Sequence, residues 1–64
     1  MAITIKAARV NVGLTQEEAS KELGISRATL ANYEAGKTVP DIEMDKKIAS
    51  LYKTSVDCLI FSAN

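Results

Sequence analysis

The residues of this chain that could carry out chemistry are few, and they do not form a catalytic set. The 64 residues include no histidine and one cysteine, Cys58, which stands in an apolar segment. The carboxylates fall at helix-capping positions or on faces expected to be exposed. No base stands beside a nucleophile, and the usual ligands of a structural zinc ion are missing. We therefore expect no catalytic residue, no metal and no cofactor.

The run Gly36-Lys37-Thr38 ends like a phosphate-binding loop. Such a loop needs another glycine five residues before Gly36 and a strand ahead of it. Ala31 occupies that position, inside a segment whose pattern predicts a helix. The sequence therefore predicts no nucleotide site, and no other small-molecule ligand is evident from it.

Composition and charge suit a small globular protein with a neutral surface. Apolar residues make up 47% of the chain and charged residues 25%, a balance that argues against disorder. Eight basic and eight acidic residues give a net charge of zero, so an anionic partner would need a locally positive face. Residues 26–40 carry Arg27 and Lys37 against one acid, while residues 41–45 carry acids and no base. One face can thus be positive.

No segment is suited to a membrane or to export. A membrane-spanning helix needs about 20 apolar residues in succession, and no run approaches that length. The N-terminus lacks the basic segment, long apolar run and cleavage site of a secretory signal. We expect a single domain over residues 1–64 that is soluble and cytoplasmic.

Helix start and stop signals recur along the chain and divide it into five short helices. The first is expected from Thr4 to Val12, before Gly13. Thr15 forms a capping box with Glu18 at the start of the second, which ends before the turn glycine. The caps of the other three are Ser26, Asp41 and Ser55. The sequence therefore predicts an all-α fold, a compact five-helix bundle.

The second and third helices are joined by a turn of about three residues that begins at Gly24. Two helices joined by so short a turn with a glycine are the local signature of a helix-turn-helix, in which the pair crosses at a steep angle. Short turns also join ordinary helical hairpins, so the spacing alone leaves both possibilities open.

The residues around the turn separate these possibilities. The chain contains Leu14-Thr15-Gln16-Glu17-Glu18, then Leu23-Gly24-Ile25-Ser26, then Asn32-Tyr33-Glu34-Ala35-Gly36-Lys37-Thr38-Val39-Pro40. With these runs at these spacings, nearly the whole chain resembles the Cro and phage-repressor type of helix-turn-helix, often called the XRE family. The resemblance implies a lambda-repressor-like bundle whose second and third helices form the motif, and a double-stranded DNA operator as partner.

The resemblance makes residues 27–35 the recognition helix of the major groove. Leu30 and Tyr33 are expected to face the core. The side chains left to face the bases are Ser26, Arg27, Ala28, Ala31 and Asn32. Arg27 can pair bidentately with guanine and Asn32 with adenine, each pair contributing roughly 1–3 kcal/mol of discrimination, and either alanine can meet a thymine methyl. The alternative for Arg27 is a solvated side chain in the first helical turn.

Phosphate contacts are expected at two places beside the recognition helix. Gln16 lies at a helix N-terminus, where backbone amides favour an anionic oxygen. Lys37 and Thr38 follow the recognition helix and are expected to contact the DNA backbone. Lys37 could equally serve as a cation at the negative end of the helix dipole.

Arg9 and Glu34 correspond to a pair that, in this family, joins the first helix to the end of the recognition helix. We expect a partly buried salt bridge that orients the reading helix, because desolvation offsets much of its Coulomb energy. The chain departs from the family at Ala19-Ser20, where leucine followed by alanine is commoner. The Ser20 hydroxyl is expected to bond to the carbonyl of Gln16.

These features favour a sequence-specific DNA-binding transcriptional regulator. It resembles a bacterial, phage or mobile-element repressor, and a homodimer would set two recognition helices about one helical turn (~34 Å) apart. The candidate dimer interface is C-terminal: Cys58, Leu59, Ile60 and Phe61. Phe61 could instead close the core, and Cys58 could be a small buried hydrophobe. The alternative function is a protein-protein interaction module that uses the C-terminal apolar helix, with little or no specific DNA binding.

Overall fold

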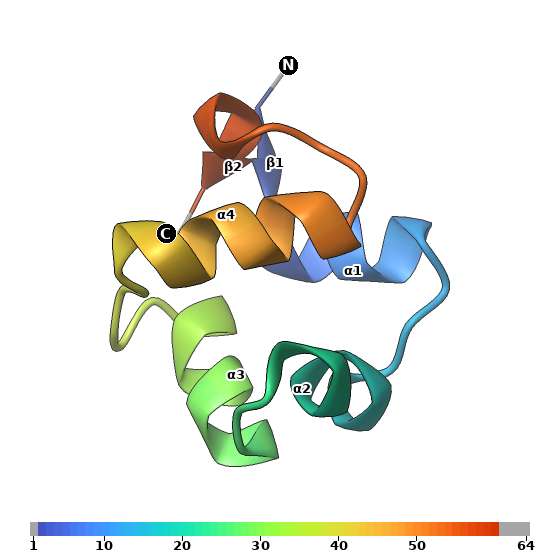
Figure 1. The fold of residues 1–64 in the computed structure, drawn as a ribbon, viewed down its shortest axis with the longest axis vertical. Helices are drawn as coiled ribbons and strands as arrows, with labels where there is room; N and C mark the ends of the chain where they lie inside the picture. The colour runs from blue at the N-terminus through green and yellow to red at the C-terminus, as the bar shows by residue number, and fades with distance from the viewer. Residues whose placement is uncertain (1, 61–64) are drawn as a thin grey trace.

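The computed structural model describes residues 2–60. A short strand, β1 (Ile3–Thr4), leads into the helices α1 (Ile5–Asn11), α2 (Gln16–Leu23), α3 (Arg27–Glu34) and α4 (Ile42–Leu51). One turn of 3-10 helix, η1 (Val56–Cys58), and the strand β2 (Leu59–Ile60) follow. Figure 1 shows the strands at one end of the molecule and α2 and α3 at the other, with α1 and α4 between them.

Each of these four α-helices begins at a residue whose side chain accepts a hydrogen bond from the backbone amide three residues on. The capping residues are Thr4, Thr15, Ser26 and Asp41. At Thr15 the box is complete, since its own amide donates to Glu18 Oε1 at 2.9 Å. This hydrogen bond from the Thr15 amide lowers the pKa of the Glu18 carboxyl. The capping box predicted from the sequence is confirmed.

The C-terminal ends of the four α-helices share one pattern of backbone hydrogen bonds. At the end of α2, the Gly24 amide donates to the carbonyl of Lys21 at 3.2 Å and the Ile25 amide to that of Ser20 at 3.0 Å. The pattern places one residue in the left-handed region, and a glycine fills that place after the first three helices. After α4 the residue is Lys53, with φ 58°. A residue with a Cβ is strained there.

One apolar core joins the helices. Its fully buried large side chains are Ile5, Leu30 and Ile48, from α1, α3 and α4. Helix α2 contributes Ala19 and Leu23, and Ala19 has no exposed surface. The core thus fixes the position of α3 from three sides.

The expected fifth helix over residues 55–60 is wrong. Within the described residues there are four α-helices, and the last segment is η1 followed by an extended strand. The Ser55 side chain caps no backbone amide; its hydroxyl donates to Cys58 Sγ at 3.1 Å. The backbone instead pairs in parallel with β1, with Ile3 opposite Leu59 and Thr4 opposite Ile60. So short a segment is marginal as a helix by itself, because helix nucleation is costly.

Two smaller expectations also change. Helix α1 begins after its cap Thr4 and ends before Val12, so it is shorter than the sequence suggested. The Ser20 hydroxyl donates to the carbonyl of Glu17 at 3.0 Å and not to that of Gln16. A serine in a helix can reach the carbonyl three or four residues back, and the sequence does not distinguish them.

Candidate nucleic-acid interface

The turn between α2 and α3 sets the direction of the candidate recognition helix. Gly24 adopts the left-handed conformation with φ 73°, and Ser26 caps α3 two residues later. Leu23 and Leu30, on either side of the turn, are buried in the same core, and Ile25 packs against it. A Cβ on Gly24 would touch nothing within 4 Å, so the backbone conformation alone requires glycine here.

Helix α3 turns one face to the core and leaves the opposite face open. Leu30 is fully buried and Tyr33 half-buried on the inner side. Of the side chains expected to reach bases, Ser26, Arg27 and Ala28 are exposed, and Ala31 and Asn32 are half-buried. All five therefore lie at the N-terminal end or on the outer side of α3. A helix in this arrangement can place its first turns in a major groove.

The Ser26 hydroxyl already has partners inside the protein. It accepts a hydrogen bond from the Thr29 amide at 3.0 Å and lies 2.8 Å from the Thr29 hydroxyl. Ser26 therefore serves as a helix cap whose side chain is tied to Thr29. Sequence reasoning did not single out Thr29, although a threonine three residues after a serine cap is placed to make this contact.

A buried polar cluster joins α1, α2 and α3. Arg9 Nε donates to Glu34 Oε2 at 2.7 Å, and Arg9 Nη1 donates to the carbonyl of Leu14 at 2.7 Å. Gln16 Nε2 donates to Glu34 Oε1 at 2.9 Å. The side chains of Arg9 and Glu34 are 9% and 5% exposed. Both carboxylate oxygens of Glu34 are thus held, which locks the C-terminal end of α3 to the first two helices.

Gln16 has a role that the sequence did not reveal. It was expected to contact phosphate, and the structure gives its side-chain amide a partner in Glu34. The same amide nitrogen carries a second N–H, and the residue is half-buried at the start of α2. An amide has two donor hydrogens, so one can hold Glu34 while the other points to a phosphate.

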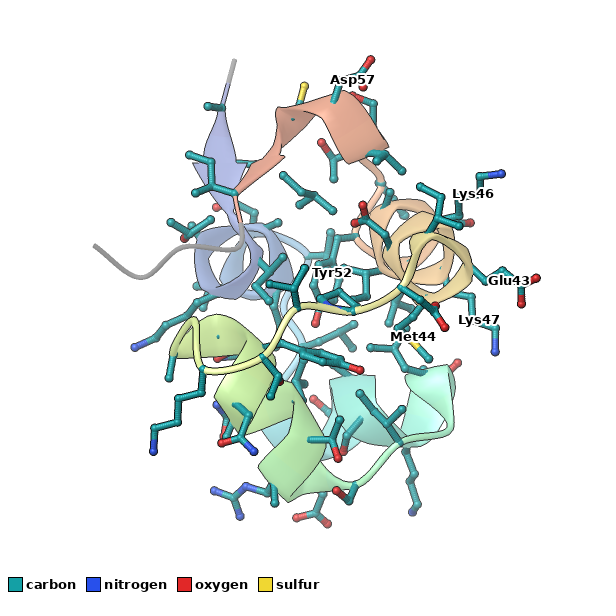
Figure 2. All side chains as sticks on the ribbon, turned by 90° about the vertical axis from the view of Figure 1, so that its left-hand side faces the viewer. Glu43, Met44, Lys46, Lys47, Tyr52 and Asp57 are labelled. Atoms are coloured by element: carbon teal, nitrogen blue, oxygen red, sulfur yellow. The ribbon has the colours of Figure 1, made fainter. Side chains whose placement is uncertain are left out.

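Tyr52, at the end of α4, adds a further polar group to this interior. It is 3% exposed, and its hydroxyl has no hydrogen-bond partner within residues 2–60. Figure 2 shows it in the interior, while Lys46, Glu43 and Lys47 extend outward from α4. Burial and the negative charge of Glu34 raise the pKa of Tyr52 to about 12, against the opposing effect of Arg9. Nothing in the sequence marked this tyrosine.

The loop after α3 carries the remaining expected phosphate contacts. Lys37 and Thr38 are exposed. The Lys37 amide donates to the carbonyl of Asn32 at 3.0 Å, which holds the loop against the helix end. Pro40 is buried and anchors the other end of the loop. The loop therefore presents Lys37 and Thr38 beside the outer face of α3.

The residues named as a dimer interface have different environments. Leu59 is buried in the core of its own chain, and Cys58 is half-buried. Ile60 is 37% exposed. Phe61 lies outside the described residues. Among the described candidates, Ile60 presents the exposed apolar side chain.

The described residues offer neither a metal-binding cluster nor a helix suited to a membrane. Residues 2–60 hold no group of three or more histidine, cysteine, aspartate or glutamate side chains placed to bind a metal ion. No helix in this part of the chain has the length and apolar character needed to cross a membrane.

The turn, the packed pair α2 and α3, and the open face of α3 define a helix-turn-helix protein. A family model described as Helix-turn-helix matches residues 5–57. The chain belongs to this family, which is of the XRE type, so the resemblance inferred from the sequence is confirmed.

Proteins from bacteria and archaea are similar to the chain. The HTH-type transcriptional regulator ImmR of Bacillus subtilis is 39% identical over 56 residues, which cover 88% of this chain and 44% of ImmR. An uncharacterized HTH-type transcriptional regulator of Archaeoglobus fulgidus is 36% identical over 62 residues, 95% of this chain and 87% of that protein. The HTH-type transcriptional activator BcrR of Enterococcus faecalis is 33% identical over 52 residues, 81% of this chain and 26% of BcrR. The chain thus spans less than half of ImmR and nearly all of the archaeal protein. No solved structure shows a significant match.

Proposed function

We propose that this protein is a sequence-specific DNA-binding transcriptional regulator that reads the major groove with α3. The observation that carries the proposal is the open face of α3, where Arg27 and Ala28 are exposed at the N-terminal end of a helix held rigidly from behind. The names of the similar proteins support it, since all of those cited are called transcriptional regulators or activators.

Each side chain has a distinct part in the proposed complex. Arg27 pairs with guanine and Asn32 with adenine, while Ala28 or Ala31 meets a thymine methyl. Gln16, Lys37 and Thr38 bind phosphates and fix the register. Ser26 acts mainly through the cap and Thr29, because its hydroxyl is already engaged.

The proposed output is repression by a homodimer in the cytoplasm of a bacterium, with a phage or mobile element as the source of the gene. A bound dimer excludes other proteins from the DNA that it covers, and a two-fold axis would match a palindromic operator. Exposed Ile60 is the described residue proposed for the dimer contact. A promoter reporter tests the sign of regulation: repression lowers expression, and a rise would show activation, the activity named for BcrR.

Selection of bound sequences from a random DNA pool at low salt tests the DNA proposal, with Arg27→Ala and Lys46→Ala as matched variants. Each removes one exposed cation, but Lys46 lies on α4. The wild type and Lys46→Ala should enrich one two-fold symmetric site, and Arg27→Ala should lose the guanine preference, a change of roughly 10- to 100-fold at that base. If the wild type enriches no sequence, specific DNA reading is excluded and the protein-binding alternative is favoured.

A further inference from the structure

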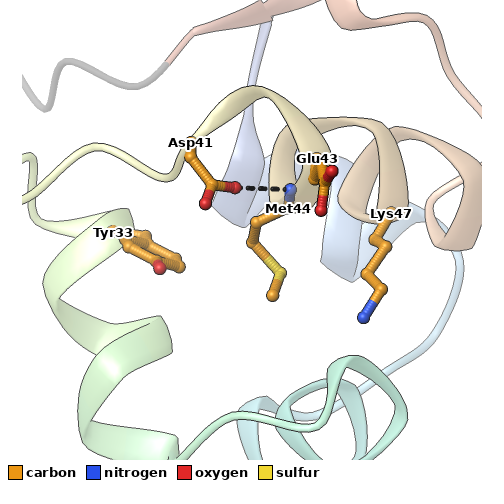
Figure 3. A pocket seen from close by; sticks show the side chains of 5 residues that line it. All are labelled: Tyr33, Asp41, Glu43, Met44 and Lys47. Atoms are coloured by element: carbon orange, nitrogen blue, oxygen red, sulfur yellow. Dashed lines mark hydrogen bonds between the residues drawn. The ribbon is translucent and has the colours of Figure 1, made fainter.

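A hollow lies between the end of α3 and the start of α4, apart from the face proposed to read DNA. Five side chains line it: Tyr33, Asp41, Glu43, Met44 and Lys47. Figure 3 shows the Tyr33 ring on one side, Lys47 on the other and the Met44 side chain between them. The hollow has a volume of about 190 Å³.

The lining has three chemical parts. Tyr33 and Met44 are half-buried and form an apolar floor. Asp41 and Glu43 supply carboxylates, and Lys47 supplies an ammonium group on the side away from Tyr33. Asp41 uses Oδ1 to cap α4, 2.8 Å from the Met44 amide, which leaves Oδ2 available.

The charges in the hollow are not neutralised by one another. Within residues 2–60 the ion pair present is that of Arg9 with Glu34, and Lys47 makes no such contact with Asp41 or Glu43. Glu43 and Lys47 stand four residues apart on one helix, where a pair could form. No ion pair joins them, so both remain available to the neighbouring opposite charges of one ligand.

We propose that this hollow binds a zwitterionic α-amino acid with an aliphatic side chain. The ligand carboxylate pairs with Lys47 and its ammonium group with Glu43 and Asp41. The aliphatic side chain lies over Met44 and the Tyr33 ring. One small molecule thereby satisfies both signs of charge and the apolar floor.

The size of the hollow favours a small ligand. Sites for drug-sized molecules commonly enclose about 300–1,000 Å³. A hollow of about 190 Å³ is smaller than these sites. A free amino acid presents an ammonium group, a carboxylate and an apolar group within that space.

The position of the hollow links the ligand to the proposed function. Tyr33 belongs to α3, Asp41 is the cap of α4, and Glu43 and Lys47 lie in α4. A ligand held by both elements fixes the loop between them, which carries Lys37 and Thr38. The regulatory part of the inference rests on the proposed DNA binding, and the coupling must be reciprocal: the ligand changes DNA affinity as DNA changes ligand affinity.

Titration of the full chain with L-leucine, followed by amide and methyl NMR shifts, tests the site without DNA. Leucinamide lacks the carboxylate and N-acetyl-leucine lacks the ammonium group. Leucine should produce saturable shifts at Tyr33 and Met44, and each analogue should bind roughly two- to fivefold more weakly, as expected for one partly exposed ion pair. Equal binding of the three compounds, or no saturable shift, overturns the proposal.

Substitutions on α4 assign the two charges. Lys47→Met should abolish the preference for leucine over leucinamide, because the carboxylate loses its partner. Glu43→Gln should reduce the preference over N-acetyl-leucine. Lys46→Ala removes an exposed cation outside the hollow and should leave all three affinities unchanged. If Lys47→Met binds like the wild type, the assignment is wrong.

A DNA-binding titration with and without saturating leucine separates regulation from binding. A shift in operator affinity that disappears in Lys47→Met supports an effector role. An unchanged affinity rejects that role but leaves the amino acid site intact. If the chain binds no DNA at all, the proposed function fails while the NMR result still decides the site.

Discussion

Two halves of the molecule differ in how well their buried polar groups are paired and in how relaxed their helix ends are. One half contains the helix-turn-helix, and the other supports it. In the reading half, residues 5–36, the buried charges of Arg9 and Glu34 are paired and glycine occupies each left-handed helix end. In the support half, residues 41–60, the Tyr52 hydroxyl and Asp45 Oδ1 have no partner within the described residues, and Lys53 adopts φ 58°. The favourable contacts are concentrated where the orientation of α3 is set. Substitutions should therefore destabilise the reading half and can stabilise the support half.

The largest effect is expected from Arg9→Met. It removes the cation and keeps an apolar stem, which leaves the Glu34 carboxylate buried without its ion pair. Breaking a buried pair on one side costs about 3–5 kcal/mol. Urea unfolding should show this loss, and Lys6→Met, which removes an exposed cation from the same helix, serves as control. A loss no larger than that of the control would show that the pair contributes nothing to the reading half.

A smaller loss is expected from Gly24→Ala at the turn. The added methyl meets no atom within 4 Å, so the effect reports the left-handed backbone alone. The expected destabilisation is about 1–2 kcal/mol by thermal unfolding. Ala35→Gly, at a helix end with right-handed backbone, is the control: it measures how much the exchange of alanine and glycine changes stability through the entropy of the unfolded chain. An unchanged melting temperature for Gly24→Ala would mean that the turn relaxes to another conformation.

Tyr52→Phe should stabilise the support half by roughly 1 kcal/mol, because it removes a buried hydroxyl that has no protein partner. The pH dependence should change as well. The folded pKa of about 12 lies above the ordinary 10.0, so stability is complete below pH 10 and falls as the pH rises toward 12. Tyr52→Phe should lose less stability over that range. Destabilisation by this substitution would show that the hydroxyl is hydrogen-bonded in solution.

The smallest effect is expected from Lys53→Gly. It relieves the left-handed strain at the end of α4, while the added freedom of the unfolded chain offsets part of the gain. The net stabilisation should be about 0.5–1 kcal/mol in urea unfolding. Lys53→Ala also removes the charge but keeps the Cβ that causes the strain, so it should not stabilise the protein. If both variants behave alike, the two halves do not differ in backbone strain.

The parts of the fold that could be predicted were those with local signals. Helix boundaries depend on neighbours a few residues away, and the structure confirms those predicted at the capping box of Thr15 and Glu18, at Ser26, at Asp41 and at Gly24. The C-terminal segment could not be predicted in the same way. Ser55 looks like another cap, but strands of two residues show no periodicity and depend on a partner 56 positions away in sequence.

The candidate site could be predicted only in part, because some of its contacts are local and others depend on tertiary packing. The exposed positions of Arg27 and Ala28 follow from helical spacing once Leu30 is assigned to the core. The bond from Gln16 to Glu34 and the proximity of Tyr52 to that cluster depend on tertiary packing. The hollow between α3 and α4 likewise brings Tyr33 to Lys47 only after folding.

The parallel pairing of β1 with β2 has a consequence for the order of folding. It joins Ile3 to Leu59, so almost the entire described chain is the loop that must close before the strands meet. Loop closure costs more entropy as the loop lengthens, while each helix needs only neighbouring residues. The strand pair should form last and open first, and amide hydrogen exchange would then be fast at Ile60 and slow at Leu30. Transient opening at the strands would leave the reading helix folded on its core.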